Sequence, residues 1–222
     1  MNLITSAAAS FLVAFPAFIS IVNPAGGALI YHQVTASRSH AERTKLAWRV
    51  AGFSAAVMLS AFWAGAPVMS FFGISIEALR VAGGLVVAVR AWEMLSEPEE
   101  NEGRKKEQAA PAALSADVAF FPLTMPFTTG PGTISVAIAL SASRPSAAAQ
   151  LAPFYLGVSV AAILVALSVG FCYALADRIV ALLGPARARI MTRLSAFLLL
   201  CIGVQIFLTG IRGVFEALPA QS

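Results

Sequence analysis

The chain has 222 residues, of which 59% are hydrophobic and only 12% are charged. Soluble proteins carry roughly 25% charged residues and disordered chains are more polar still, so this composition excludes both classes. The mean hydropathy of +0.81 indicates an integral membrane protein instead. A net charge of +4 does not indicate a nucleic-acid partner, because the basic residues lie between apolar runs without interleaved aromatic residues.

Charged residues are so sparse that they mark the ends of the apolar runs. Backbone polar groups inside a bilayer must be satisfied within the chain, so each run is predicted to be a helix. The six predicted spans cover residues 6–33, 46–72, 75–95, 117–142, 150–176 and 190–212. The sequence therefore predicts an all-α integral membrane protein with six transmembrane helices and the lipid bilayer as its surroundings.

The distribution of basic residues predicts the orientation of these spans. The loops after the first, third and fifth spans share nine basic residues: Arg38, Arg43, Lys45, Arg104, Lys105, Lys106, Arg178, Arg187 and Arg189. The opposite side has three, namely Arg80, Arg144 and Arg212. Because Lys and Arg accumulate in cytoplasmic loops, both termini are expected outside, in the periplasm of a bacterial inner membrane.

The chain divides into two halves, residues 1–95 and 115–222, joined by a cytoplasmic linker at 96–114. Three features recur in the same order: a first span interrupted by Pro and Gly, a second span that ends at a glycine, and a third span that begins near an arginine. The glycines are Gly73 and Gly184, and the arginines are Arg80 and Arg193. Since each half has three spans, the halves must enter the membrane in opposite directions. This predicts two inverted three-helix repeats, an architecture found in many secondary transporters.

Pro- and Gly-rich segments interrupt the first and fourth spans. The first break comprises Asn23, Pro24, Ala25, Gly26 and Gly27, and the second comprises Thr128, Thr129, Gly130, Pro131 and Gly132. An ordinary kink is one interpretation, since Pro and Gly are common in membrane helices. Each break, however, lies about 22 Å of helix before the next charged residue, well inside the bilayer. Irregular backbone at that depth is tolerated where it lines a cavity or is buried in protein.

Each break is predicted to begin a new half-helix whose N-terminus can bind an anion. Asn23 is a favoured N-cap residue and Pro24 suits the first helical position, and the two threonines before Pro131 are expected to act similarly. Free N–H groups and the positive end of the helix dipole favour a carboxylate. The site holds no acidic side chain, so an amine would bind carbonyls freed by the breaks or the Asn23 oxygen.

These breaks, the six spans and the arginine-containing span starts resemble the MarC family, also called the small neutral amino acid transporter family. The resemblance covers essentially the whole chain and is strongest over residues 122–132. It implies an inner-membrane carrier of small neutral amino acids, such as glycine, alanine, serine or threonine, that acts in export. Asp is frequent in the family where this chain has Asn23, so no protonatable carboxylate is expected there.

Three further polar residues within the spans have two interpretations each. Arg80 and Arg193 either extend to the membrane interface or bond the carbonyls of a neighbouring broken helix. Gln205 either forms a hydrogen bond between helices or lines the transport pathway. Ridges of small residues in the second and fifth spans suit contacts within the chain or a homo-oligomer.

A passive channel for small polar solutes is the alternative function, because rings of carbonyls in an oligomer can form a pore. The paired inverted breaks favour a carrier with alternating access. An enzyme is not expected, since both histidines lie at or beyond one end of the first span. No metal site or cofactor is predicted, and the absence of a phosphate-binding Gly-x-x-x-x-Gly-Lys-[Ser/Thr] motif excludes direct ATP coupling by this chain.

Overall fold

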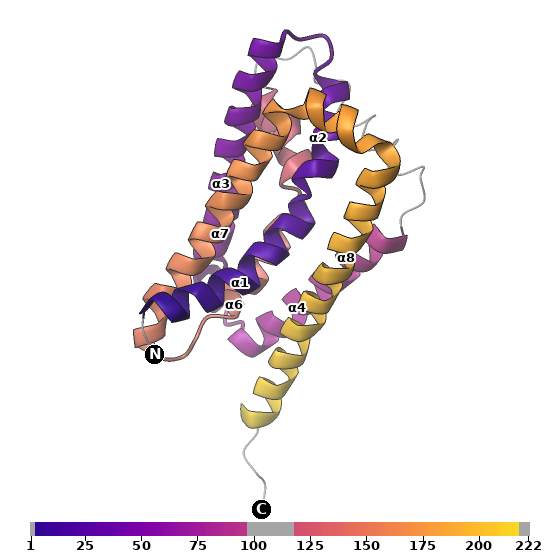
Figure 1. The fold of residues 1–222 in the computed structure, drawn as a ribbon. Helices are drawn as coiled ribbons and strands as arrows, with labels where there is room; N and C mark the ends of the chain where they lie inside the picture. The colour runs from indigo at the N-terminus through magenta and orange to yellow at the C-terminus, as the bar shows by residue number, and fades with distance from the viewer. Residues whose placement is uncertain (1–2, 97–117, 218–222) are drawn as a thin grey trace, which may run out of the picture.

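A computed structural model describes residues 3–96 and 118–217, and this part of the chain is helical (Figure 1). In chain order the helices are α1 (Leu3–Val22), α2 (Pro24–Val34), α3 (His40–Phe71), α4 (Ile76–Ser96), η2 (Ala119–Thr128), α6 (Pro131–Ala142), α7 (Ala148–Ala174) and α8 (Ala176–Ala217). The predicted cytoplasmic linker covers residues 96–114, and all of it after Ser96 lies outside the described residues.

Four segments are long and apolar enough to cross a membrane. They are Leu3–His32, His40–Val68, Ala148–Ala174 and Ala196–Glu216, which correspond to the first, second, fifth and sixth predicted spans. The third predicted span forms α4, and the fourth forms η2 together with α6, a shorter apolar helix. The prediction of an all-α integral membrane protein is thus confirmed in the helical character of the described residues and in four helices that are long and apolar enough to span a membrane.

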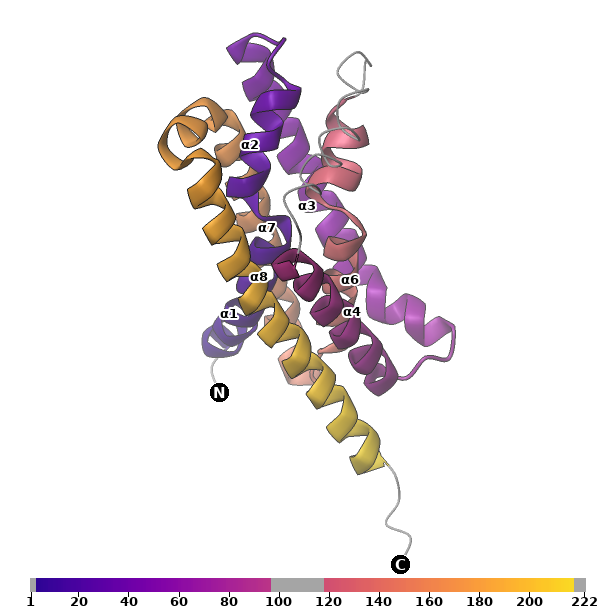
Figure 2. The same ribbon diagram turned by 90° about the vertical axis from the view of Figure 1, so that its right-hand side faces the viewer.

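The helices pack as an elongated bundle in which neighbours in space come from different halves of the sequence (Figures 1 and 2). Helix α1 packs along α7, α3 packs against α6 and α7, and α4 crosses α8. Glycines allow the last crossing to be close: a Cβ added at Gly203 would lie 2.6 Å from the Ala88 nitrogen, and one at Gly210 would lie 2.7 Å from the Val81 nitrogen. Small residues at such contacts let two backbones approach.

The interior is filled by aromatic and aliphatic side chains, and large apolar side chains also cover the outside. Phe18, Phe62 and Tyr173 are essentially inaccessible, whereas Trp63 and Phe171 are more than half exposed. A soluble protein rarely exposes so many large apolar groups. The exposed apolar surface is therefore the surface expected to contact lipid.

The two glycines predicted to end the second span of each half have different outcomes. Gly73 follows the end of α3 and has a φ of 72°, the left-handed conformation that ends many helices, so this prediction is confirmed. Gly184 lies within α8, so the predicted loop between spans five and six is wrong. Residues 176–189 are rich in Ala, Leu and Arg, which favour helix strongly enough to continue through Gly184 and Pro185.

Candidate functional site

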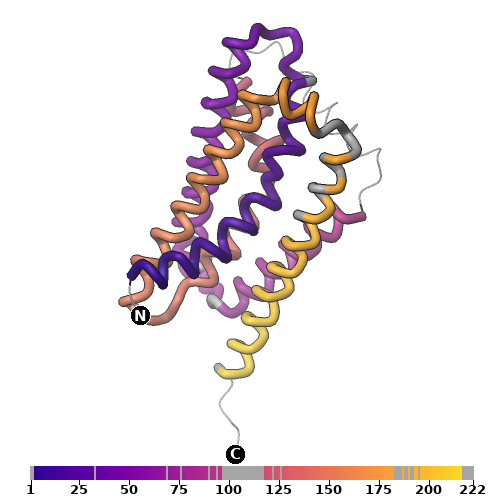
Figure 3. The backbone as a smooth tube through the Cα atoms, in the orientation of Figure 1, coloured from indigo at the N-terminus to yellow at the C-terminus, as the bar shows by residue number. Residues whose placement is uncertain are grey.

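The first break is confined to one residue, Asn23, between α1 and α2, and the backbone changes direction there (Figure 3). Its φ is 46°, in the left-handed region that Asn tolerates better than most residues. A residue before proline is also disfavoured in the right-handed helical region, so Pro24 helps to end α1. The Asn23 N–H still donates to the Ile19 carbonyl at 2.9 Å, so α1 is bonded up to the break.

The side chain of Asn23 caps α2, as predicted. Its Oδ1 accepts a hydrogen bond from the Gly26 N–H at 3.2 Å, and its carbonyl accepts one from the Gly27 N–H at 2.9 Å. A Cβ at Gly26 would collide with the Asn23 amide, so a glycine is needed for the cap to close over the first turn. The N-terminus of α2 therefore carries its own polar cap.

The second break is longer, because two prolines impose it. The residues before them, Phe121 and Met125, have extended φ and ψ angles of −121° and 124° and of −112° and 125°. This is the conformation that a following proline favours. Pro122 has no N–H for the Val118 carbonyl, which instead accepts from the Leu123 N–H at 3.4 Å, one residue further along. The register widens to that of a π-helix, η2.

Three threonine hydroxyls satisfy carbonyls within this widened segment. The Oγ1 atoms of Thr124, Thr128 and Thr129 donate to carbonyls five residues earlier, at 2.6, 2.6 and 3.2 Å. All three side chains are buried, so these bonds replace helical ones that the prolines remove. The hydroxyl protons of Thr128 and Thr129 are thus committed to η2.

The second half-helix begins at Pro131, as predicted, but without the predicted threonine cap. Gly130 occupies the N-cap position with φ −76° and ψ −175°, and no side chain caps the helix there. The prediction that Thr128 and Thr129 cap α6 was wrong, because their hydroxyls donate to carbonyls of η2, which precedes the break. The start of α6 is therefore bare backbone with the positive end of a helix dipole.

Tyr173 of α7 links the two breaks. Its hydroxyl lies 3.0 Å from the Thr128 Oγ1, and a Cβ added at Gly27 would lie 2.5 Å from the same hydroxyl. The Tyr173 side chain is 1% exposed, so it has little room to move away. Sequence analysis missed Tyr173; the available signal was a tyrosine hydroxyl inside an uncharged run, where a buried O–H needs a partner.

The predicted site residues are mostly shielded within the protein. Asn23, Ala25, Gly26, Gly27 and Gly130 are half-buried, Pro24, Thr128, Thr129 and Gly132 are buried, and Pro131 is exposed. Residues from both breaks thus surround the Tyr173 hydroxyl. The arrangement offers backbone donors, one amide and a buried phenol, which suits recognition of a small polar molecule more than acid–base chemistry.

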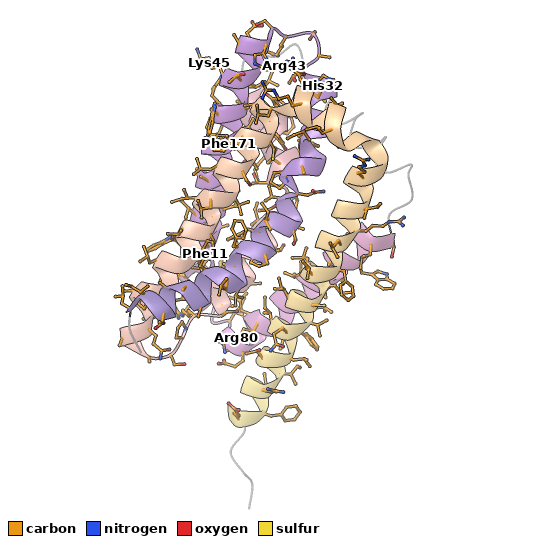
Figure 4. The ribbon with its side chains drawn as sticks, in the orientation of Figure 1. Phe11, His32, Arg43, Lys45, Arg80 and Phe171 are labelled. Carbon is orange, nitrogen blue, oxygen red and sulfur yellow. The ribbon has the colours of Figure 1, made fainter. Side chains whose placement is uncertain are left out.

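Arg80 anchors the far end of α6, and Figure 4 shows it near the end of the molecule that holds this terminus. Its Nε donates to the Ala142 carbonyl at 2.8 Å, and its Nη2 donates to the Arg144 carbonyl at 3.1 Å. The interpretation of Arg80 as a ligand of broken-helix carbonyls is therefore confirmed. A cation also complements the negative end of the α6 dipole.

The two polar residues predicted in the sixth span, Arg193 and Gln205, both lie on α8. Arg193 is exposed, which agrees with extension towards the membrane interface. Gln205 is also exposed, so its amide is not buried between helices of this chain as a hydrogen bond between helices would require. Both residues are exposed on α8. The apolar pattern of the sequence did not predict which face of this helix packs against the protein and which faces outward.

The chain was compared with known proteins. The family model for the MarC family integral membrane protein matches residues 8–215. The inner membrane protein MarC of Salmonella typhimurium (strain LT2) is 32% identical over 204 residues, which cover 89% of this chain and 92% of that protein. The protein of the same name from Escherichia coli O1:K1 is 34% identical over the same shares of each chain. No solved structure matches this chain.

The extent of these matches excludes a likeness limited to one motif. Both breaks, Arg80 and Tyr173 lie within the matched residues, and the relatives are named inner membrane proteins. Together with the apolar helices, they identify a multi-pass inner membrane protein. The chain belongs to the MarC family of integral membrane proteins.

Proposed function

We propose that this protein is a secondary transporter that exports small neutral amino acids, such as glycine, alanine, serine and threonine, by alternating access. The observation that carries the proposal is the meeting of the two helix breaks at the Tyr173 hydroxyl. Broken helices that meet inside a membrane protein are the usual place for a transporter's substrate.

The substrate carboxylate binds at the half-helix starts, chiefly at α6. That helix begins without a side-chain cap, and its Thr133 and Ile134 N–H groups donate to the Gly130 carbonyl. Because Pro131 has no N–H, the Gly132 N–H is the donor of this helix start that an anion would bind. The α2 start contributes less, because Asn23 already accepts from Gly26. The amine binds carbonyls released where η2 leaves helical geometry, or the second lone pair of Asn23 Oδ1.

The small size of the substrate follows from the contacts at Gly27. The Tyr173 ring and hydroxyl fill the space that a side chain at residue 27 would take. Glycines at 130 and 132 allow the backbone to approach a ligand, while the buried phenol limits the volume beside the first break. A substrate with a short side chain suits this arrangement.

The transporter would consist of two inverted three-helix repeats. The packing supports this arrangement: α1 of the first half packs on α7 of the second, and correspondingly η2 and α6 of the second half pack on α3 of the first. The third spans, α4 and α8, pack on each other, which is compatible with a two-fold relation between the halves. In our proposal both termini are periplasmic and the linker at 96–114 is cytoplasmic.

The protein acts as a carrier, in this proposal, and neither as an enzyme nor as a passive pore. The test is uptake of labelled glycine, alanine, serine and threonine by proteoliposomes with and without a proton gradient. We expect saturable uptake and counterflow, in which internal unlabelled substrate accelerates entry of labelled substrate. Non-saturable flux without counterflow would identify a channel, and no flux of any of these amino acids would reject the substrate class.

A further inference from the structure

Four polar side chains from three helices meet at one end of the molecule. His32 comes from α2, His40 and Arg43 from the start of α3, and Asp177 from the start of α8. Figure 4 labels His32 and Arg43, which lie close together at the end of the bundle opposite Arg80. We call these four residues the α2 cluster. It lies outside the predicted substrate site.

The centre of the α2 cluster is an ion pair between Arg43 and Asp177. Two parallel hydrogen bonds join Nη1 to Oδ1 and Nη2 to Oδ2, each at 2.8 Å. Such two-pronged pairs are the strongest and most geometrically specific type. The Arg43 side chain is 15% exposed and that of Asp177 is 42% exposed, so the guanidinium is shielded from water while the carboxylate is partly hydrated.

Both histidines place Nδ1 next to the same carboxylate. His32 Nδ1 lies 3.2 Å from Asp177 Oδ1 and 3.2 Å from Arg43 Nη1, and His40 Nδ1 lies 3.4 Å from Asp177 Oδ2. In the neutral tautomer with its proton on Nε2, His32 Nδ1 can accept a hydrogen bond from Arg43 Nη1. In protonated His32 this Nδ1 carries a proton, so two cationic donors face each other 3.2 Å apart beside Asp177 Oδ1.

Protonation therefore changes the charge balance around one carboxylate. With neutral histidines, one guanidinium faces one carboxylate. With both histidines protonated, three cations surround that single anion, and two of them lie 3.2 Å apart. Burial raises the pKa of the Asp177 carboxyl, but the hydrogen bonds and charge of Arg43, together with the hydrogen bond of His40 and the charge of His32, outweigh burial and hold this pKa below its usual value. Asp177 thus stays ionised at mildly acidic pH.

The α2 cluster is physically connected to the helix breaks through α2. The Tyr31 hydroxyl donates to the Arg43 carbonyl at 2.6 Å, and the Tyr31 ring stacks on Tyr173 with the ring centroids 4.5 Å apart. The Tyr173 hydroxyl in turn lies 3.0 Å from Thr128 Oγ1. One end of α2 therefore carries the Asn23 break, and the other end is held by the α2 cluster.

We propose that the α2 cluster is a proton-binding latch, which holds α2 against α3 and α8 when its histidines are neutral and releases α2 when they are protonated. In the proposed orientation the latch closes the cytoplasmic side of the carrier. Its consequence for transport rests on the proposed function, whereas the movement of α2 does not.

Four other charged side chains lie near the α2 cluster in sequence, on α3, on α8 and in the turn before α3. Glu42 accepts hydrogen bonds from the N–H and hydroxyl of Ser39 at the start of α3. Arg38 is half-buried in the turn between α2 and α3, while Lys45 and Arg178 are exposed.

The test measures how accessible the end of α2 becomes. Thr35, just beyond α2, is 1% exposed, whereas Ser37 in the same turn is exposed. Each is replaced by Cys in full-length protein in nanodiscs, with Cys172→Ala and Cys201→Ala. The rate of maleimide labelling of Thr35→Cys is divided by that of Ser37→Cys, which cancels the effect of pH on the thiol itself. We expect this ratio to rise at least about fivefold from pH 8 to pH 5.5, the size expected for loss of an ion pair.

Two variants and one control complete the design. His32→Gln should flatten the pH dependence of the labelling ratio, and Asp177→Asn should raise the ratio already at pH 8. Lys45→Gln, two residues from Arg43 but exposed, should behave as the parent does. A ratio that is constant with pH in the parent, that falls at low pH, or that rises equally in His32→Gln would overturn the latch. Amino acid flux is measured separately on the same proteins, so a flat ratio with normal flux rejects the latch alone, and a pH-dependent ratio without flux rejects the proposed substrates alone.

Discussion

The two helix breaks interrupt their spans in different ways. The first is a single left-handed residue, Asn23, which caps the next helix with its own side chain. The second extends through a π-helix and an extended glycine, and its half-helix starts without a side-chain cap. The two breaks, one in each half of the sequence, thus interrupt a helix by separate physical routes.

This difference gives the proposed site a polarity. The capped start of α2 offers fewer free donors, while the bare start of α6 offers more. An amino acid is also asymmetric, with one anionic and one cationic group. Two unequal half-helices therefore suit such a ligand better than two identical ones, because only one of them needs to bind the carboxylate.

The largest expected effect concerns Gly27, where the two breaks meet. In Gly27→Ala the new Cβ would lie 2.5 Å from the Tyr173 hydroxyl oxygen and 3.1 Å from the nearest carbon of its ring. Because Tyr173 is buried, we expect transport to fall by about tenfold to a hundredfold, as overpacking costs roughly 1–3 kcal/mol. Transport in proteoliposomes is the measurement.

The control and the rescue for this substitution are available in the same chain. Gly52→Ala introduces a Cβ with no heavy atom within 4 Å and should leave transport unchanged. Adding Tyr173→Phe to Gly27→Ala removes the colliding hydroxyl and should restore part of the activity. If Gly27→Ala transports normally, the two breaks do not meet at Tyr173 as described.

The second prediction concerns one of the two prolines that cause the long second break. Pro122→Ala returns an N–H to the position opposite the Val118 carbonyl, which allows ordinary helical register. We expect η2 to shorten and transport to fall by about tenfold or more, since displacements near 1 Å can cost that much. Pro16→Ala is the matched control, because Pro16 lies inside α1, which continues as a regular helix around it. Equal effects of both substitutions on transport would mean that the π-helix has no special role.

Sequence patterns predicted the positions of both breaks and the capping role of Asn23. These features are local: the residue before a proline, the short polar side chain and the glycines that follow act within one turn of chain. The carbonyls bound by Arg80 were predicted only as one of two alternatives. Choosing between them required the distance between α4 and the end of α6, which no local pattern contains.

Two parts of the structure could not be predicted in this way. Tyr173 lies about 45 residues from Thr128 in the chain, and its contact depends on how α7 packs against both breaks. Thr128 and Thr129 were predicted to cap α6 because capping is a common role of threonine, but the Leu123 and Thr124 carbonyls of η2 competed successfully for their hydroxyls. Long-range packing and competition between acceptors are both invisible in a single sequence.

The third prediction separates the two roles of Asn23, backbone conformation and capping. Asn23→Gly keeps access to the φ of 46° but loses the cap, whereas Asn23→Ala loses both. Loss of the cap costs a few tenths of a kcal/mol for Gly and about 1 kcal/mol for Ala, and the left-handed conformation costs about 1–2 kcal/mol more for Ala. We therefore expect substrate affinity to fall no more than about twofold in Asn23→Gly and tenfold or more in Asn23→Ala. Equal affinities of the natural protein and Asn23→Ala would remove this residue from the site.

The fourth prediction adds a titratable group to the capped break. Asn23→Asp retains a side-chain oxygen for the Gly26 N–H, so the cap should persist. The carboxylate would repel the substrate carboxylate, so protonation of the new Asp is favoured when substrate is bound. Transport by Asn23→Asp should therefore increase as the pH falls from 8.5 to 5.5, relative to the natural protein. Identical pH profiles would place the substrate carboxylate away from the first break.

The smallest expected effect distinguishes the two threonines of the second break. In Thr128→Val the Leu123 carbonyl loses its 2.6 Å donor and Tyr173 loses its hydrogen-bond partner, with an expected cost of about 1–3 kcal/mol. In Thr129→Val only a 3.2 Å bond is lost, because the Thr124 carbonyl still accepts from the Thr129 N–H at 2.8 Å. Transport should therefore fall about tenfold in Thr128→Val and no more than about threefold in Thr129→Val. Valine keeps the shape of threonine, so the comparison isolates the hydroxyl. If Thr129→Val proves the more damaging, its hydroxyl has a role beyond η2, and the substrate contact at the second break belongs to Thr129 rather than to the Thr128–Tyr173 pair.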